Sequence, residues 1–289
     1  MRKLNFFKYH GNGNDFIIFD SRESYQYNDY LQGKNHPQVR TLCDRNFGIG
    51  ADGVIFLLKP LNYENDARMI IFNSDNSEAE MCGNGIRCLI QYLIDINKSK
   101  EIKKTYRIET KAGLKIGEYL DESISVKMGK PIFNRDLIPT KINKFDKGIA
   151  VSEFKYKNFS SLGYAVGMGN PHLVFFIPDL DEININELGP YFESDPLFPE
   201  KTNVHFCEII DRNNIKVFVW ERGAGKTLAC GTGACAIHAA AFKLGYCNNK
   251  TSINLPGGEL SINWSNNNEE VNMKGKAENV FNGNYIFNK

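Results

Sequence analysis

The feature that most constrains this chain is a pair of nearly identical stretches 148 residues apart (230 − 82). In each stretch, Cys-Gly-polar-Gly opens a strongly apolar segment, and the two cysteines are Cys82 and Cys230. A second pair, Gly-x-Gly-Asn before an apolar run, ends at Asn14 and Asn170, 156 residues apart (170 − 14). Two repeats in the same order predict a duplicated unit of roughly 140 to 150 residues. We therefore expect two similar halves that face each other across a cleft, where small-molecule sites concentrate.

The apolar segments that follow the two cysteines are predicted to be helices. Apolar residues recur at the spacing of one helix face from Ile86 to Leu93, and residues 234–244 are apolar on nearly every side. Each cysteine then stands at a helix N-terminus, where N–H groups and the helix dipole lower the pKa of a thiol and bind carboxylates. A single cysteine of this kind is often only a core residue. Two in matched contexts favour a shared chemical role.

Short apolar runs bounded by Gly, Asp and Asn predict strands throughout both halves, and hence an α+β chain. Glycine and proline at positions 129 and 131, before a polar and irregular stretch, mark the boundary between the halves. We expect an N-terminal half made of residues 1–128 plus about 275–289, because the apolar tail is expected to return to it. The C-terminal half is expected to span residues 129–274.

Charge and length exclude several function classes. Basic and acidic residues nearly balance, at 35 against 34, so the sequence predicts no nucleic-acid or membrane partner. The N-terminus lacks an apolar signal segment, and the longest clear apolar run, residues 54–58, is far shorter than the ~20 residues of a membrane span. The seven cysteines follow neither a disulfide framework nor a zinc motif. We expect a soluble, cytoplasmic protein with reduced thiols and no metal.

Three segments resemble nucleotide-binding loops, but each lacks either a required glycine or the required helix. Gly-Lys-Thr at 225–227 resembles the end of a phosphate-binding loop, which requires glycine where the chain has Trp220. The Gly-rich segment at Gly11 lacks the third glycine of a dinucleotide fingerprint, and the one at Gly48 precedes a strand where the fingerprint requires a helix. No nucleotide cofactor is therefore expected.

Two cysteines at two helix N-termini suit the transfer of a proton on and off a carbon beside a carboxylate. One thiolate removes the proton from one face while the opposite thiol donates to the other face, so that the stereocentre inverts. Without a cofactor, the charge of the carbanion flows into the carboxylate, where backbone N–H groups stabilise it. We expect those groups to belong to Gly83, Asn84, Gly231 and Thr232.

Glu221 and Arg222 form an acid–base pair directly after a predicted strand, at the place that Asn73 holds in the first half. A surface ion pair is the ordinary explanation. An acid beside a base also suits a second ammonium and carboxylate, since arginine holds a carboxylate with two parallel hydrogen bonds and glutamate binds the amine. A single loop asparagine is usually a turn residue, but four are expected to complete this polar pocket: Asn14, Asn73, Asn170 and Asn203.

The sequence resembles the diaminopimelate epimerases along essentially its whole length. The motifs that carry the resemblance are His10-Gly-x-Gly-Asn-Asp-Phe16, Gly48-Ile-Gly-Ala-Asp-Gly53, Phe72-Asn-x-Asp-x-Ser-Glu78, Cys82-Gly-Asn-Gly-x-Arg87, Met168-Gly-Asn-Pro-His172, Asn203, Glu221-Arg-Gly-Ala-Gly225, Cys230-Gly-Thr-Gly-Ala-Cys235 and Leu255-Pro-Gly-Gly258. Two positions depart from the family pattern. Gly53 stands where some members carry a substrate-contacting glutamine, and Ser74-Asp-Asn76 stands where Ala-Asp-Gly is usual.

The resemblance implies a cofactor-independent isomerase, without pyridoxal phosphate, that interconverts LL- and meso-2,6-diaminopimelate in lysine and peptidoglycan-precursor synthesis. It implies two pseudo-symmetric halves, each a curved mixed or antiparallel sheet wrapped around a central helix, an active site in the cleft between them, and a homodimer. Cys82 and Cys230 become the acid–base pair, and His172 and Glu221 the groups that tune their pKa values. The implied substrate-binding residues are Asn14, Asn73, Gly83, Asn84, Asn170, Asn203, Glu221, Arg222, Gly231 and Thr232.

Two other functions stay open. A related proline or hydroxyproline racemase or epimerase would share the two cysteines but would need no site for a second ammonium and carboxylate. A non-catalytic protein that binds an amino acid would instead use Cys82 and Cys230 as a redox-switched thiol pair.

Overall fold

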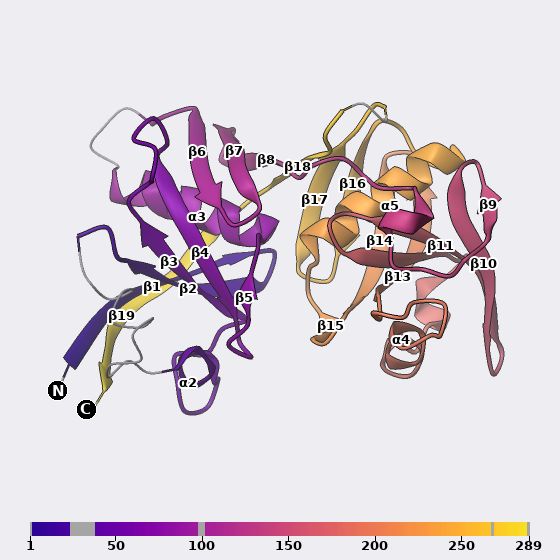
Figure 1. Ribbon diagram of the computed structural model, residues 1–289, viewed down its shortest axis with the longest axis horizontal. Helices are drawn as coiled ribbons and strands as arrows, with labels where there is room; N and C mark the ends of the chain where they lie inside the picture. The colour runs from indigo at the N-terminus through magenta and orange to yellow at the C-terminus, as the bar shows by residue number, and fades with distance from the viewer. Residues whose placement is uncertain (1, 24–37, 98–101, 267–268, 288–289) are drawn as a thin grey trace. The chain divides into compact units, whose positions relative to one another are not determined.

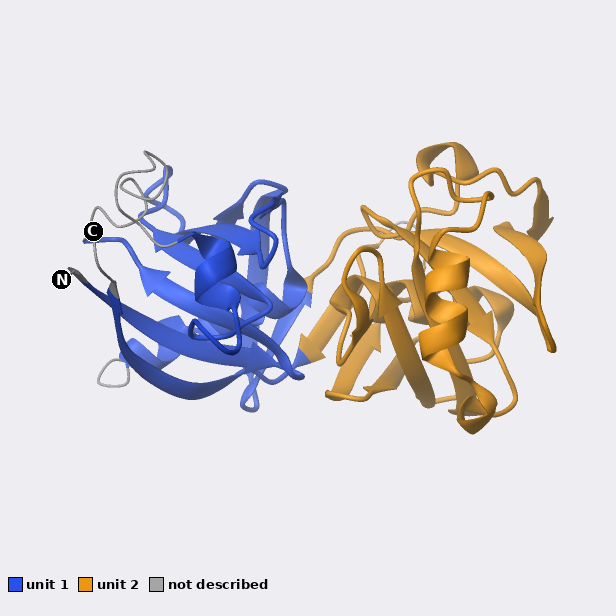
Figure 2. Ribbon diagram, turned by 90° about the horizontal axis from the view of Figure 1, so that it is seen from below, with its two compact units in different colours: residues 1–126, 275–289 blue, residues 127–274 orange. Residues whose placement is uncertain are grey.

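We describe the fold from a computed structural model of the chain (Figure 1). The structure describes residues 2–23, 38–97, 102–266 and 269–287. By its internal contacts the chain divides into two compact units, shown in blue and orange in Figure 2. Unit 1 comprises residues 1–126 and 275–289, and unit 2 comprises residues 127–274.

Unit 1 contains a mixed sheet. Strand β1 pairs antiparallel with both β19 and β2, and β2 pairs parallel with β3. Strand β4 pairs antiparallel with β3 and β5 and parallel with β6, and β7 and β8 continue antiparallel. The elements are β1 (Arg2–Gly11), β2 (Asn14–Asp20), α2 (Val39–Cys43), β3 (Gly53–Leu58), β4 (Ala67–Asn73), β5 (Glu78–Ala79), α3 (Gly83–Ile96), β6 (Thr105–Thr110), β7 (Gly113–Leu120), β8 (Ser123–Lys127) and β19 (Glu278–Phe287).

Unit 2 contains a second mixed sheet. Strand β11 pairs antiparallel with both β10 and β12, and β12 pairs parallel with β13. Strand β14 pairs antiparallel with β13 and β15 and parallel with β16, and β17 and β18 continue antiparallel. The elements are β9 (Lys144–Asp146), β10 (Ile149–Tyr156), β11 (Phe159–Gly167), β12 (Pro171–Phe176), α4 (Ile185–Glu193), β13 (Asn203–Asp211), β14 (Asn214–Glu221), β15 (Gly225–Thr227), α5 (Gly231–Leu244), β16 (Lys250–Leu255), β17 (Gly258–Asn263) and β18 (Asn272–Gly275), with short 3-10 turns at 135–137 and 180–182.

The two sheets share one connectivity. In each unit a hairpin leads into a parallel pair, a second hairpin and a short strand, after which one helix crosses to a further parallel strand. The registers match as well, since Phe16 pairs with Gly53 in unit 1 and His172 pairs with Asn203 in unit 2. The position of Gly53 is therefore the counterpart of Asn203.

Helices α3 and α5 confirm the two helices predicted after the repeated cysteines. Cys82 and Cys230 are the N-cap residues, with extended backbones (φ −139°, ψ 118° and φ −122°, ψ 111°) that turn into the helix at the next residue. Helix α5 ends at Gly245, whose φ of 83° is the left-handed conformation that glycine adopts without strain. Within the described ranges, no helix combines the length and apolar character needed to cross a membrane.

Each cysteine helix packs against the sheet of its own unit. Helix α3 contacts β1, β2, β3, β4, β7 and β19, and α5 contacts β11, β12, β13, β16 and β17. The residues of both helices are buried along most of their length, and each fully buried aliphatic side chain contributes roughly 1.5–3 kcal/mol relative to an exposed one. A helix fixed over its length in this way holds its first turn, and with it the cysteine, in a defined place.

Helix α4 forms although its segment contains Pro190 and is followed by Pro196 and Pro199. Ile185, Leu188 and Phe192 are buried at helical spacing against β13 and β14. Pro190 lies inside the helix, where its missing N–H removes one backbone hydrogen bond. Burial of the apolar face outweighs that loss.

Candidate functional site

Cys82 lies where strands β4 and β5 lead into helix α3. Its Sγ accepts a hydrogen bond from the Gly85 N–H at 3.4 Å, in the first turn of the helix. The thiol also lies 3.9 Å from Asn14 Oδ1, to which it donates. The side chain is half-buried. The N-cap geometry thus aims backbone N–H groups at the sulfur, as the sequence predicted.

A directed chain of hydrogen bonds fixes the two asparagines beside Cys82. Arg87 Nη2 donates to Asn84 Oδ1 at 2.6 Å, so the other end of that amide, Nδ2, donates to Asn14 Oδ1 at 3.0 Å. Asn14 Nδ2 then donates to Asp52 Oδ2 at 2.8 Å. Arg87 is fully buried, and its guanidinium also donates to Asn12 Oδ1 and to a backbone carbonyl. Both amides therefore have one defined orientation.

A charged cluster behind Asn14 holds this chain in place. Arg45 bridges two carboxylates, at 2.9 Å from Asp15 and 2.9 Å from Asp52, and Lys8 lies 2.8 Å from Asp15. Burial works against ionisation of Asp15, but hydrogen bonds from Arg45 and Lys8 outweigh it and lower the pKa of that carboxyl. Asp15 is therefore ionised at neutral pH and neutralises the buried ammonium of Lys8.

The substitution Asp15→Asn is expected to lower the free energy of unfolding at pH 7 by about 2 kcal/mol, the contribution typical of hydrogen bonds to charged groups. Because the native pKa lies below the unfolded value of ~3.9, the carboxylate stabilises above about pH 4, and this contribution is lost as pH falls through the native pKa. Urea unfolding at pH 7, 5 and 3 measures the effect. Asp136→Asn, at an exposed ion pair, serves as the control and should change stability by less than about 0.5 kcal/mol. An equal difference between variant and parent at all three pH values would contradict this account.

Cys230 occupies the matching place in unit 2, between β15 and α5. Its Sγ accepts from the Gly233 N–H at 3.4 Å and lies 3.5 Å from Thr232 Oγ1. Asn170 Nδ2 donates to the same Thr232 oxygen at 3.5 Å. Asn170 and Thr232 are the counterparts of Asn14 and Asn84 in the repeat, but the sulfur of Cys230 contacts Thr232, whereas the sulfur of Cys82 contacts Asn14.

The pKa of Cys230 departs from the expectation that a helix N-terminus lowers it. Burial of the thiol and the negative charge of Glu221 raise its pKa well above the ordinary value, although hydrogen bonds from Thr232 and Gly233 act in the opposite direction. The protonated thiol also donates a hydrogen bond to Glu221. Cys230 is thus a thiol at neutral pH.

Two histidines lie behind Asn170, in full burial. His172 Nε2 is 2.8 Å from Asn170 Oδ1, and His172 Nδ1 is 2.9 Å from His205 Nε2. Burial lowers the pKa of His172 well below its ordinary range, with His205 and Arg222 adding to the effect, and burial lowers the pKa of His205 to about 3. Both rings are therefore neutral at physiological pH.

The remaining predicted residues of unit 2 form a second polar group. Asn203 Nδ2 donates to the Pro171 carbonyl at 2.8 Å, and its Oδ1 accepts from the Arg222 N–H at 3.0 Å. The Arg222 guanidinium donates to the Glu200 carbonyl at 2.9 Å. Asn203 thereby ties the start of β13 to the turn that carries Arg222.

Asn73, the unit 1 counterpart of Glu221, is exposed at the end of β4. Its backbone N–H bonds the Ser77 carbonyl at 2.9 Å and its side-chain amide donates to Ser77 Oγ at 3.0 Å. The structure thus brings Asn14, Asn84 and Cys82 together in unit 1, with Asn73 in a neighbouring turn. In unit 2 it brings together Asn170, His172, Thr232, Glu221 and Cys230, with Asn203 and Arg222 adjoining.

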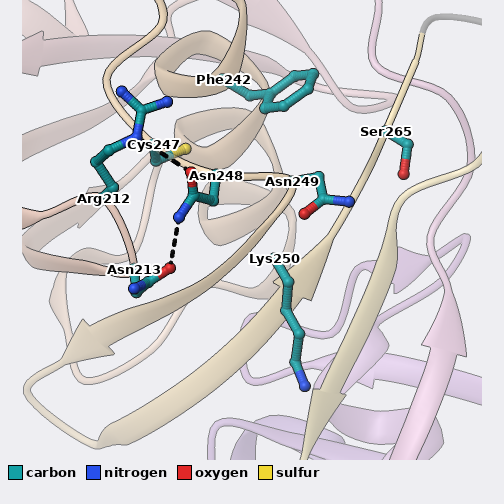
Figure 3. A pocket seen from close by; sticks show the side chains of 8 residues that line it. All are labelled: Arg212, Asn213, Phe242, Cys247, Asn248, Asn249, Lys250 and Ser265. Carbon is teal, nitrogen blue, oxygen red and sulfur yellow. Dashed lines mark hydrogen bonds between the residues drawn. The ribbon is translucent and has the colours of Figure 1, made fainter.

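Described residues of unit 2 line at least two cavities. One of about 380 Å³ is lined by Asn170 and Arg222 together with Ile132, Leu137 and Glu200. Another, about 580 Å³, lies near the end of α5, where Arg212 donates to Asn248 and Asn248 donates to Asn213 (Figure 3). None of the predicted site residues lines it. In the described part of the chain, no group of three or more His, Cys, Asp or Glu side chains could hold a metal ion.

Several residues of these networks were not singled out from the sequence, among them Asp52, Arg87 and His205. Asp52 and Arg87 stood inside quoted motifs, without an expected role. His205 lay outside the strands expected from the sequence, but in β13 it follows Asn203 by two positions and so shares its face. The pairing of β13 with β12 places that face against His172, the other buried histidine. This pairing is known only from the folded structure.

The chain is similar in sequence to known proteins over nearly its whole length. A family model described as diaminopimelate epimerase matches residues 6–134 and 164–280. The chain is 49% identical over 288 residues to a diaminopimelate epimerase of Prochlorococcus marinus (strain NATL2A), which covers 97% of this chain and 98% of the relative. It is 45% identical over 281 residues to one of Synechocystis sp. (strain ATCC 27184 / PCC 6803 / Kazusa), with 97% and 98% covered.

Solved structures show the same mixed α/β fold, rich in strands and with few helices, at low sequence identity. A hydroxyproline epimerase from Agrobacterium vitis matches with a TM-score of 0.68 and 12% identity over 99% of this chain and 91% of its own. A phenazine biosynthesis protein of the PhzF family from Enterococcus faecalis matches with a TM-score of 0.67 and 11% identity, over 99% and 100%. These likenesses concern the fold alone.

Proposed function

The chain belongs to the diaminopimelate epimerase family, and we propose that Cys82 and Cys230 are the acid–base pair with which it epimerises diaminopimelate. The observation that carries this proposal is the pair of matched N-caps. In each unit, a cysteine sulfur accepts an N–H of the first helical turn, at 3.4 Å, and also contacts a polar side chain, Asn14 in unit 1 and Thr232 in unit 2. Two such thiols suit a reaction that needs one base and one acid.

In the proposed reaction, one thiolate removes the α-proton of LL-diaminopimelate and the other thiol delivers a proton to the opposite face, which gives the meso isomer. The roles exchange in the reverse direction. The reaction requires both cysteines to reach one substrate, so we place the active site in the cleft between two pseudo-symmetric halves, each a curved sheet around its cysteine helix. The halves are proposed to follow the division at residues 128 and 275.

The charge that develops on the substrate carboxylate needs donors that are already in place. The first N–H groups of an α-helix have no partner within the helix, and the helix dipole favours an anion there. We assign this role to Gly83 and Asn84 of α3 and to Gly231 and Thr232 of α5. Donors of this kind contribute about 3 kcal/mol each to a transition state when water is excluded.

The distal end of the substrate carries a second carboxylate and ammonium. We propose that Arg222 binds the carboxylate and Glu221 the ammonium, with Asn73, Asn170 and Asn203 completing the pocket. The cavity that Asn170 and Arg222 line supports this assignment, because its polar edge adjoins the Cys230 turn. Asn14, held in one orientation by Asn84 and Asp52, is proposed to contact the reacting end.

Glu221 is also proposed to control the proton on Cys230. Its carboxylate accepts the hydrogen bond of the thiol, so it can take that proton when Cys230 acts as the base. His172 is neutral and donates toward Asn170, so we propose that it tunes the thiols through hydrogen bonds without carrying a charge. No cofactor takes part in this proposal, and a cytoplasmic homodimer serving lysine and peptidoglycan-precursor synthesis is its setting.

The shared fold alone would also suit a racemase or epimerase of proline or hydroxyproline. Such a substrate has no distal ammonium and carboxylate, and it would leave Glu221 and Arg222 without a role. A redox-switched binding protein would need neither a directed donor at each sulfur nor a carboxylate placed to accept the proton of Cys230.

The proposal is tested by incubating the reduced protein in D2O, without added cofactor, with LL-diaminopimelate, L-proline and trans-4-hydroxy-L-proline in turn. We expect α-deuterium uptake and conversion to the meso isomer with diaminopimelate only. Exchange with the imino acids alone would overturn the substrate assignment. Absence of exchange with all three, in protein with titratable thiols, would favour the redox-switched binding protein.

A further inference from the structure

The two buried histidines of unit 2 form a hydrogen-bonded pair whose order of donors can be derived. A neutral imidazole carries one N–H and one lone pair, so each ring donates through one nitrogen and accepts through the other. His172 contacts a carbonyl oxygen, Asn170 Oδ1, through Nε2 and contacts His205 Nε2 through Nδ1. Since a carbonyl oxygen only accepts, His172 must carry its proton on Nε2, and His205 must then donate from Nε2.

The opposite order of donors would require the Asn170 amide to rotate by 180°, so that Oδ1 and Nδ2 exchange places. It would also require the protons of His172 and His205 to lie on Nδ1. His205 Nδ1 has no hydrogen-bond partner in the described structure. In the first order this nitrogen is a buried lone pair, whereas in the second it would be a buried N–H without an acceptor. Orphaned buried N–H groups are rarer than under-satisfied acceptors, so the first order is the stable one.

The same order continues to the sulfur of Cys230. With Oδ1 accepting from His172, the Asn170 amide directs its Nδ2 to Thr232 Oγ1. Thr232 then accepts through its oxygen and has its own hydrogen available for Cys230 Sγ at 3.5 Å. Every hydrogen bond in the chain from His205 to Cys230 therefore points toward the sulfur.

Packing holds the first ring of this chain in position. A Cβ built on Gly233 would lie 2.4 Å from His205 Cε1, so the imidazole rests directly against the first turn of α5. The rings of His172 and His205 lie 5.1 Å apart with an interplanar angle of 30°. His205 thus has little freedom to present its other nitrogen.

We infer that His205 is a positioning residue, whose Nε2–H holds His172 in the Nε2–H tautomer and, through Asn170 and Thr232, directs a hydrogen bond to the sulfur of Cys230. The consequence for catalysis rests on the proposed function of Cys230. The order of the hydrogen-bond donors does not depend on that function, and it can be measured without substrate.

The direct test is a long-range ¹H–¹⁵N spectrum of the protein labelled with ¹⁵N-histidine, since protonated and unprotonated ring nitrogens have distinct ¹⁵N shifts. At pH 7, His172 and His205 are both expected to show a protonated Nε2 and an unprotonated Nδ1. A protonated Nδ1 on His172 would overturn the inference in the parent protein, with no variant required.

Variants then test whether His205 sets this order. His205→Met removes the donor at similar size, so the His172 signals are expected to move toward a mixture of tautomers and α-deuterium exchange to slow about ten-fold, mainly in kcat. His205→Gln can donate from a similar position and is expected to restore most of the rate and the Nε2–H tautomer. His238→Met is the matched control, because His238 is equally buried on α5 but takes no part in the chain of hydrogen bonds from His205 to Cys230.

We expect His238→Met to keep the His172 tautomer and to exchange deuterium within two-fold of the parent. If the His172 tautomer is unchanged in His205→Met, or if α-deuterium exchange slows equally in the Met and Gln variants at position 205, His205 contributes only packing. If the parent protein shows no exchange, the proposed function fails while the spectrum still decides the order of donors.

Discussion

Alanine at position 82 is expected to abolish epimerisation, with a loss of about 10³-fold or more in kcat for LL-diaminopimelate. General acid–base groups contribute roughly 10² to 10⁴ each, and no other described thiol shares the N-cap of α3. Cys230→Ala is expected to have an effect of the same size, because the reaction needs an acid and a base in both directions. Chiral analysis of the product in D2O measures both variants.

The chain offers a matched control within each cysteine helix. Cys88 and Cys235 lie on α3 and α5 with side chains fully buried in the core. Alanine at these positions is expected to lower stability by about 1 kcal/mol through lost packing, while the folded enzyme keeps its kcat within about three-fold. Normal epimerisation by folded Cys82→Ala would sink the two-thiol mechanism.

Oxidation is expected to abolish activity completely and reversibly. An oxidant such as diamide removes two electrons and two protons from Cys82 and Cys230 and leaves one disulfide, after which neither sulfur can accept or donate a proton. A disulfide requires Cα atoms about 4.4–6.8 Å apart, so its formation would also show that the two cysteines reach one place in solution. Peptide mapping under non-reducing conditions and activity before and after a thiol reductant measure the result.

The control is Cys82→Ser, which should yield no such cross-link under the same oxidant. Cys88 and Cys235 serve as an internal reference, since both side chains have no exposed surface that an oxidant could reach. Full activity with the bond between residues 82 and 230 intact would refute the mechanism. Recovery of activity without loss of the cross-link would do the same.

Sequence pattern alone predicted the local geometry around both cysteines. The repeat of Cys-Gly-polar-Gly before an apolar segment placed Cys82 and Cys230 at helix starts, and both are N-cap residues. This succeeded because capping and amphipathic spacing are local rules. Helix α4 does not follow from the same rules, since Pro190 disfavours a helix in this segment and packing on β13 and β14 makes the helix favourable there.

The electrostatics of the site could not be predicted from the same patterns. The helix N-terminus predicts a lowered pKa for Cys230, but burial and the Glu221 charge dominate and raise it. The buried partners Arg87 and His205 depend on which strand face meets which helix, and that follows from register across residues far apart in the chain. Local sequence identifies the groups that react, and long-range pairing decides their protonation.

Strand β19 belongs to unit 1 although it follows unit 2 in the sequence, and this affects the order in which the two units fold during synthesis. Strand β19 pairs with β1 from Arg2 to His10, so residues synthesised before unit 2 bind residues synthesised after it. Domains usually fold from the N-terminus during synthesis. Here unit 2 is complete before β1 finds its partner, and the half that begins first is finished last. A nascent chain stopped before residue 278 would therefore carry a folded unit 2 and an open edge on β1.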